Sequence, residues 1–313
     1  MKRKYFIMIG IILLLAVLFI FFLNEQHSPA GQPTFKSQIE ANQEEELTDA
    51  KEQTDTPLEK EDAEEEQTSN EQAPLQDDKP FPERISEVLE TTLNFFLSNQ
   101  TRVVAIGDSL TQGVGDVTNQ GGYVGVLERT INENGEVAKF ENYGKRGNRS
   151  NQLLKRLDER EIRSSIKKAD IVLITIGAND IMQVAKENIM NLKLNDFIEQ
   201  RIYYEQNLRQ IVNKIRDLNG NAEIYLVGFY NPFEKYFQDI EELNTIVETY
   251  NSTTESIAEK NDNVMFIPTI DLFHDTNTNL FAEDNFHPNY LGYHKIAKRV
   301  LDYISNDIMS EES

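Results

Sequence analysis

The 313-residue chain contains no cysteine and only four histidines. The absence of cysteine excludes disulfide bonds, thiolate catalysis and lipid attachment through cysteine. It suits a protein outside the cytoplasm, although many cytosolic proteins also lack cysteine. Basic residues are scarce as well, because 31 Lys and Arg stand against 53 Asp and Glu and give a net charge of -22. That charge argues against nucleic acid as a partner.

Sequence motifs for metals and phosphate-containing cofactors are also missing. The chain has no His-x-x-x-His pair and no paired aspartate motif, so the sequence predicts no metal site. The segment 113–115, Gly-Val-Gly, lacks the lysine and the spacing of a phosphate-binding loop. We therefore expect neither a metal nor a cofactor.

Residues 1–23 have the composition of a membrane segment. Three basic residues at 2–4 precede an uncharged run over 5–23, which as a helix would span roughly 28 Å, close to the ~30 Å hydrocarbon thickness. A cleaved signal peptide is the alternative, but its apolar region is shorter, about 7–15 residues, and no convincing cleavage site follows. We expect an uncleaved single-pass anchor in the cell membrane, with the remaining chain extracellular.

Residues 24–80 have the composition of a disordered linker. They include 17 acidic and 4 basic residues and few large apolar ones, so they cannot bury enough surface to offset the entropy of ordering. An acidic interaction tail is the alternative to a solvated spacer. Residues 81–313 then form the one predicted globular domain, without an internal repeat.

Short apolar runs alternate with helical patterns along this domain, which is typical of a parallel α/β sheet. Apolar residues at helical spacing first mark a helix at 85–96. Strands are predicted at 102–106, 138–143, 171–176, 223–227 and 264–267. Helices are predicted near 123–133, 150–157, 196–218, 240–260 and 290–305.

The first predicted strand ends in a turn that carries Ser109. Ligands of open parallel sheets bind at the carboxyl ends of strands, where a serine nucleophile would be presented to solvent. Capping of a helix is the alternative role for this serine. Asp108 is expected to hold the turn and is assigned no chemical step.

His287 is the predicted base for this serine, since a serine hydroxyl reacts only when a base takes its proton. Asp284 precedes it by three residues, a spacing that lets the carboxylate fix the tautomer of the ring and stabilise the imidazolium. His274 is the alternative base, although with its acidic neighbours it could instead form a salt-bridged loop or a surface metal contact. His294 falls inside the last predicted helix.

Four blocks resemble those of the GDSL, or SGNH, hydrolases and occur in the order of that family. They are GDSL at 107–110, NYGKRG at 142–147, GAND at 177–180 and DNFHP at 284–288. The resemblance implies an esterase, lipase or acylhydrolase, and the predicted anchor at 1–23 would make it a membrane-anchored member of the family. It also implies a three-layer α/β/α sandwich with a five-stranded parallel sheet, which is a flavodoxin-like arrangement.

The same resemblance implies the site. Ser109, Asp284 and His287 would form the catalytic triad. The oxyanion hole would consist of the backbone N–H groups of Ser109 and Gly147 and the side-chain amide of Asn179. An ordinary turn glycine and an Asx turn are the alternatives for the last two residues. Asp180 is expected to cap the helix that follows.

The expected substrate is a carboxylic ester of an O-acylated glycan or of a lipid, cleaved through an acyl-enzyme. Transfer of the acyl group to a glycan or lipid acceptor and a catalytically silent surface binding module are the alternatives. The sequence leaves the oligomeric state open. It also leaves open whether Lys145, Arg146 and Arg149 bind an anionic substrate or only carry surface charge. The aromatic residues at 229–237 are expected to line an acyl pocket, form a lid or pack in the core.

Overall fold

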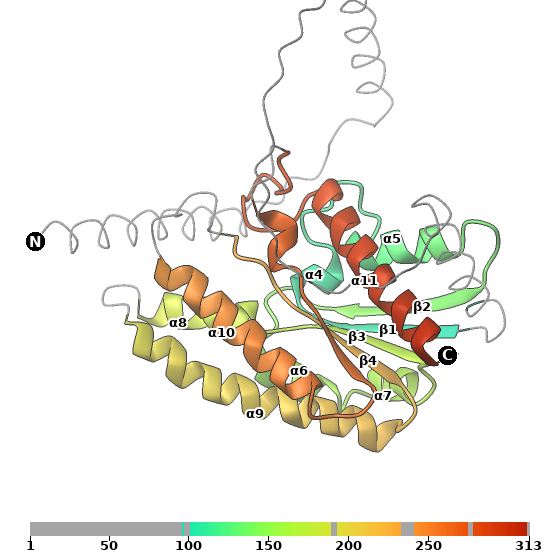
Figure 1. Cartoon of the computed structure of the whole chain (residues 1–313), viewed down its shortest axis with the longest axis horizontal. Helices are drawn as coiled ribbons and strands as arrows, with labels where there is room; N and C mark the ends of the chain where they lie inside the picture. Colours follow the sequence, from blue (N-terminus) through green and yellow to red (C-terminus); the bar gives the residue numbers. More distant parts are fainter. Residues whose placement is uncertain (1–95, 97–100, 189–192, 233–240, 275–277, 312–313) are drawn as a thin grey trace, which may run out of the picture. The chain divides into compact units, whose positions relative to one another are not determined.

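The computed structural model describes residue 96 and residues 101–188, 193–232, 241–274 and 278–311 (Figure 1). All of them belong to one compact unit. The predicted anchor at 1–23, the linker at 24–80 and most of the helix predicted at 85–96 lie outside the described residues. Within the described ranges, no helix has both the length and the apolar character needed to cross a membrane.

Five parallel strands form the central sheet. They are β1 (Thr101–Gly107), β2 (Ala138–Gly144), β3 (Ile171–Thr175), β4 (Glu223–Val227) and β5 (Val264–Ile267). The spatial order is β2-β1-β3-β4-β5. The five strand predictions are therefore confirmed to within one residue at each end. In the register of the sheet, Gly107 pairs with both Gly144 and Thr175, so the carboxyl ends of β1, β2 and β3 lie side by side.

The five helices predicted after residue 101 are also present. They are α5 (Gly122–Ile131), α6 (Ser150–Arg156), α9 (Leu194–Leu218), α10 (Glu241–Ala258) and α11 (Tyr290–Glu311). The predictions missed α4 (Ser109–Gln112), α7 (Arg160–Ile166), α8 (Ala178–Glu187) and the 3-10 helix η1 (Ile270–Phe273). These four elements span at most ten residues, which leaves few repeats of an apolar pattern to detect.

Helices cover both faces of the sheet (Figure 1). Alternate strand residues point to opposite faces, so Val104 and Ile106 pack with the core formed by α6 to α10, whereas Val103 and Ala105 pack with the core that includes α5 and α11. The predicted three-layer α/β/α sandwich is confirmed for the described residues.

The strand order places a topological switch point between β1 and β3. Connections leave these two neighbouring strands toward opposite sides of the sheet, which opens a crevice outside their carboxyl ends where ligands of this architecture bind. Ser109 follows β1, Asn179 follows β3 and Gly147 follows the adjacent β2. The fold therefore gathers three of the predicted site residues at one edge of the sheet.

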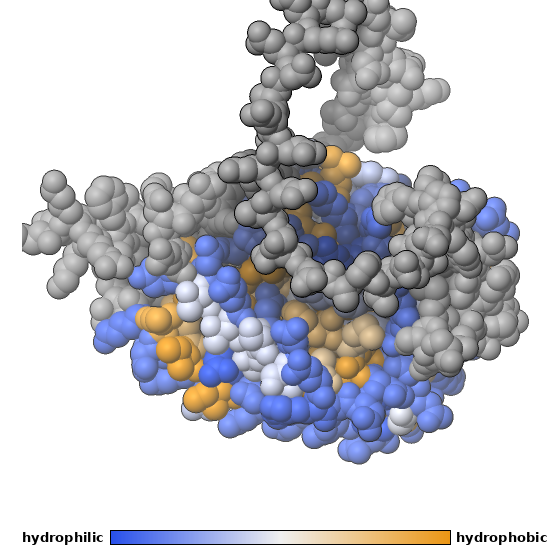
Figure 2. Space-filling view, viewed as in Figure 1, coloured by the Kyte–Doolittle hydropathy of each residue, from blue (hydrophilic) through white to orange (hydrophobic). Residues whose placement is uncertain are grey.

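The surface of the described residues is mostly polar in the view of Figure 2, with apolar side chains in several places, one of them near the start of α9. Leu194, Ile198 and Ile202 are exposed there, at intervals of four residues along one side of the helix. The buried residues of α9, such as Leu208 and Ile211, pack in the core. This helix thus carries a narrow apolar stripe on its outer face.

Candidate active site

Ser109 is the first residue of α4 and follows β1 directly. Asp108 is the N-cap of α4, because its side chain accepts a hydrogen bond from the N–H of Leu110 at 3.0 Å. The capping role considered for Ser109 thus falls to its neighbour. The Ser109 hydroxyl has no hydrogen-bond partner within the described residues, and it is not among their fully enclosed unpaired polar atoms. It therefore keeps contact with solvent, as a nucleophile requires.

Asp108 is buried beside this serine and has an unusual pKa. Burial raises the pKa of Asp108 to about 7, although hydrogen bonds from the Leu110 N–H and the Thr175 hydroxyl oppose the increase. The Thr175 hydroxyl donates to Asp108 Oδ1 at 2.9 Å and lies 2.7 Å from the Thr111 hydroxyl. Asp108 thus ties the end of β1 to the end of β3, in agreement with its predicted role of holding the turn.

Asp284 and His287 lie on residues 282–288, which we call the histidine loop. Asp284 Oδ2 lies 2.6 Å from His287 Nδ1, and Asp284 Oδ1 accepts the N–H groups of Phe286 and His287 at 3.0 and 2.9 Å. Burial acts to raise the pKa of Asp284, but the hydrogen bonds and the His287 charge outweigh it and lower the pKa. An ionised carboxylate only accepts, so Nδ1 carries the ring proton and Nε2 is the basic nitrogen of the neutral ring.

The histidine loop is fixed by contacts beyond this pair. Ala282 N–H donates to the His287 carbonyl at 2.9 Å. Tyr230, which follows β4, donates its hydroxyl proton to the Phe286 carbonyl at 2.7 Å, and its ring stacks on Phe273 with centroids 3.9 Å apart. This supporting role of Tyr230 was not predicted from the sequence, although the aromatic segment that contains the residue was.

The segment after α4 passes directly against the histidine loop. Val114 N–H donates to the Ser109 carbonyl at 3.0 Å. The next residue, Gly115, has a φ of +94°, and a Cβ there would lie 2.8 Å from the His287 Cβ, so only glycine allows this approach. No hydrogen bond joins the Ser109 hydroxyl to His287 in the described structure. Such bonds are often long in enzymes without substrate.

Residues 145–150 and 177–180 form a second group, which we call the amide corner. Asn179 Nδ2 donates to the Asn148 carbonyl at 3.0 Å, which uses one of its two N–H bonds. Gly147 has a φ of +76°, and a Cβ there would face open space. Neither the second Asn179 N–H nor the backbone N–H of Gly147 or Ser109 has a partner among the described residues. The three predicted oxyanion donors are thus available to a ligand.

Asp180 does not cap α8, contrary to expectation. The N-cap of α8 is Gly177, and no side chain caps it. Asp180 instead accepts two hydrogen bonds from Ser150, the first residue of α6. Burial raises the pKa of Asp180, although the bonds from Ser150 and the charge of Arg149 oppose the increase.

The other candidate residues lie in more open surroundings. His274 and His294 are exposed, whereas the His287 side chain is only 2% exposed. Lys145 and Arg146 are exposed and Arg149 is half-buried, so these cations flank Gly147 at the surface.

The aromatic segment at 229–237 is only partly described. Phe229 and Tyr230 are buried in the two cores, which agrees with the core alternative and excludes a lid role for these two. Residues 233–237 lie outside the described residues.

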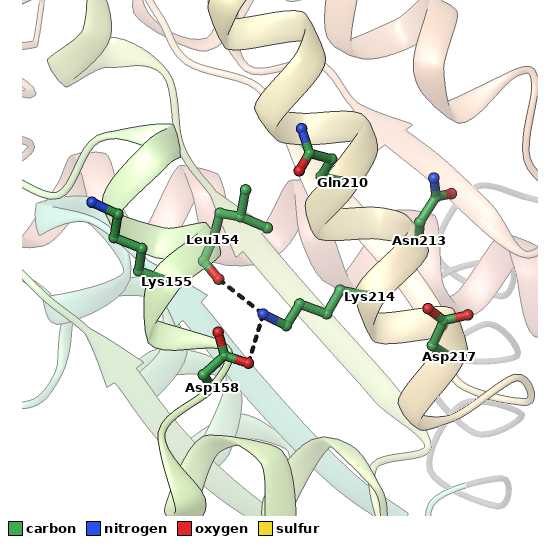
Figure 3. A pocket seen from close by; sticks show the side chains of 7 residues that line it. All are labelled: Leu154, Lys155, Asp158, Gln210, Asn213, Lys214 and Asp217. Carbon is green, nitrogen blue, oxygen red and sulfur yellow. Dashed lines mark hydrogen bonds and ion pairs between the residues drawn. The ribbon is translucent and has the colours of Figure 1, made fainter.

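A surface hollow of about 480 Å³ lies between α6 and α9 (Figure 3). The Lys214 ammonium reaches across it, 2.7 Å from Asp158 Oδ1 and 3.5 Å from the Leu154 carbonyl. None of the predicted site residues lines this hollow, so it is separate from the amide corner and the histidine loop. Within the described ranges, no three His, Asp or Glu side chains are grouped as metal ligands would be.

Comparison with known proteins connects this geometry to a family. The sequence profile of the GDSL-like Lipase/Acylhydrolase family matches residues 105–295. The chain belongs to this family. The match begins within β1, just before the Ser109 turn, and ends within α11, just after the histidine loop, so it spans both parts of the candidate site.

Individual proteins are also similar to this chain. The uncharacterized protein YpmR of Bacillus subtilis is 36% identical, over 67% of this chain and 84% of YpmR. The spore germination lipase LipC of Bacillus licheniformis is 27% identical, over 63% of this chain and 92% of LipC. The crystal structure of the lipase Lip_vut3 from a goat rumen metagenome is similar with a TM-score of 0.57 and 26% identity, over 64% of this chain and 95% of the lipase. Family and neighbours together support a carboxylic ester hydrolase.

Proposed function

We propose that this protein is a serine esterase that cleaves carboxylic esters through an acyl-enzyme, with Ser109 as nucleophile. The observation that carries the proposal is the Asp284–His287 pair, in which Asp284 Oδ2 lies 2.6 Å from Nδ1 of the buried His287, on a loop that contacts the segment following α4. An imidazole bound to a carboxylate makes a serine nucleophilic when it takes the hydroxyl proton, and the Ser109 hydroxyl has no other partner among the described residues.

The first half of the reaction forms the acyl-enzyme. His287 Nε2 takes the proton from Ser109 Oγ as this oxygen attacks the ester carbonyl carbon. The N–H groups of Ser109, Gly147 and Asn179 stabilise the negative charge that develops on the carbonyl oxygen. The C–O bond to the alcohol then breaks, and the imidazolium of His287 returns its proton to the leaving alkoxide.

The second half releases the acid. Water takes the place of the alcohol, His287 accepts its proton, and the resulting oxygen attacks the acyl carbon. Collapse of the tetrahedral intermediate breaks the bond to Ser109 Oγ, which recovers its proton from His287. Throughout the cycle, ionised Asp284 stabilises the imidazolium form of His287.

We propose a lipid ester as the first substrate class and an O-acylated glycan as the second. The order follows from two lipases among the similar proteins, LipC and Lip_vut3. The basic flank and the apolar run of residues 1–23 support an anchor that holds the hydrolase domain at the outer face of the cell membrane.

The test is hydrolysis of p-nitrophenyl acetate by the full chain purified in detergent. The wild type should release nitrophenolate, and Ser109→Ala should lose nearly all of this activity. Full activity of Ser109→Ala would overturn the assignment. Two further substrates separate the two substrate classes. An ester with a longer acyl chain represents the lipid esters, and an acetylated xylooligosaccharide represents the O-acylated glycans. Free acid as the sole product in the presence of a glycan acceptor would argue against acyl transfer.

A further inference from the structure

The loop that carries Gly147 is attached to the start of α8 at two points. Asn148 receives the side-chain N–H of Asn179 at 3.0 Å. Two residues further along, Ser150 donates to Asp180 through both its backbone N–H, at 2.9 Å, and its hydroxyl, at 2.6 Å. These contacts join segments that are about 30 residues apart in the sequence, across the carboxyl ends of β2 and β3.

The Asp180–Ser150 contact lies in the protein interior. Asp180 is 1% exposed and Ser150 is fully buried. On its other side, the Ser150 hydroxyl receives the side-chain N–H of Asn207 from α9 at 3.0 Å. A buried carboxylate that accepts two hydrogen bonds from one residue fixes both its distance and its orientation. The first turn of α6 therefore cannot shift relative to α8 without leaving a buried acceptor unpaired.

We infer that Asp180 is a positioning residue for the oxyanion hole. It does not touch the substrate. It holds the loop that bears the Gly147 N–H against the helix that bears the Asn179 amide, so that both donors face one oxyanion. The inference rests on the proposed function, because it assigns Asp180 a part in that reaction. Displacement of donors by about 1 Å is expected to lower kcat by up to about 10²-fold.

Asp180→Asn is the decisive variant, since it preserves volume but places an N–H₂ group where Ser150 requires an acceptor. We expect kcat on p-nitrophenyl acetate to fall about 10- to 100-fold with KM within about threefold, because alignment of the donors acts mainly in the transition state. Hydrogen exchange of the peptide over 144–150 should become faster. Ser150→Ala, which removes only the hydroxyl bond, should lower kcat less.

Asp170→Asn is the matched control. Asp170 Oδ2 accepts the backbone N–H of Arg102 at 2.7 Å, so this carboxylate also joins two elements of the sheet, but at the amino end of β3. The same chemical change there should leave kcat and the exchange of 144–150 unchanged. This control makes the same chemical change at an exposed carboxylate, whereas a positioning role predicts a loss of kcat and faster exchange of 144–150 only in Asp180→Asn.

The outcomes separate the inference from the proposed function. If folded Asp180→Asn retains kcat within twofold of the wild type, the positioning role is overturned. If that variant does not fold, Ser150→Ala decides, and unchanged kcat with unchanged exchange overturns it. If the wild type itself hydrolyses no ester, the proposed function fails. Hydrogen exchange would then test only whether Asp180 holds the loop that bears Gly147. Unaltered protection of residues 144–150 in Asp180→Asn would contradict that attachment.

Discussion

The histidine loop and the amide corner lie at the same end of the sheet but are built in different ways. In the histidine loop, Asp284 makes its three hydrogen bonds within the next three residues. In the amide corner, the bonds from Asn179 and to Asp180 cross about 30 residues of sequence. The carboxylate that binds the base thus belongs to the same loop as the base, whereas the donors are held by contacts between the segments that follow β2 and β3. Changes in the two regions should consequently have different signatures.

Asp284→Asn should have the largest effect. The amide cannot stabilise the imidazolium and would favour the wrong tautomer of His287, so we expect kcat to fall by about 10³- to 10⁴-fold. Steady-state hydrolysis of p-nitrophenyl acetate measures this. His274→Asn is the control and should stay within twofold. A large loss of kcat in His274→Asn together with a small loss of kcat in Asp284→Asn would instead identify His274 as the base.

Asn179→Ala should have the next largest effect. Loss of one oxyanion donor typically lowers kcat by about 10²- to 10³-fold, and KM should change little because the donor acts on charge that develops in the transition state. Asn188→Ala is the matched control, since Asn188 lies at the other end of α8 and its amide donates to the Val184 carbonyl. Equal kcat values for the two variants would exclude Asn179 from the oxyanion hole.

The contrast between the regions also explains which parts of the site could be predicted. The spacing of Asp284 and His287 was visible in the sequence because their contact is local. β1, β3, β4 and β5 were predicted because each contains a continuous apolar run, whereas β2 (AKFENYG) alternates apolar and polar residues over only part of its length. The attachment of Ser150 to Asp180 was missed, and Asp180 was expected to cap its own helix, since no local pattern reveals which distant N–H a buried carboxylate will accept. The role of Tyr230 was missed for the same reason.

Asp108→Asn should change how stability depends on pH. Asp108 has a pKa of about 7 in the folded protein, against about 3.9 in an unfolded chain. The folded state therefore binds the proton more tightly, and this contribution to the free energy of unfolding is complete below pH ~4 and is lost as pH rises toward ~7.

The asparagine variant lacks this titration. Its free energy of unfolding relative to that of the wild type should therefore increase by about 2.5 kcal/mol between pH 5 and pH 8. Urea denaturation at several pH values measures the difference. A difference that does not vary with pH would show that Asp108 titrates alike in the folded and unfolded states.

Tyr230→Phe should have the smallest effect. It removes the hydroxyl that donates to the Phe286 carbonyl, at a cost of about 1 kcal/mol of stability, and should lower kcat several-fold through a less fixed histidine loop. Tyr225→Phe is the control, because that hydroxyl donates to Asp307 in α11. It should affect stability without affecting kcat. An equal loss of kcat in both variants would argue that Tyr230 acts only through global stability.

The most direct measurement of the central claim is peptide mapping by mass spectrometry after treatment of the full chain with a fluorophosphonate. The account predicts one phosphonyl group on Ser109, formed rapidly in the wild type, slowly in His287→Asn and not at all in Ser109→Ala. A wild-type protein that hydrolyses esters while Ser109 remains unlabelled, or that is labelled at another serine, would contradict it.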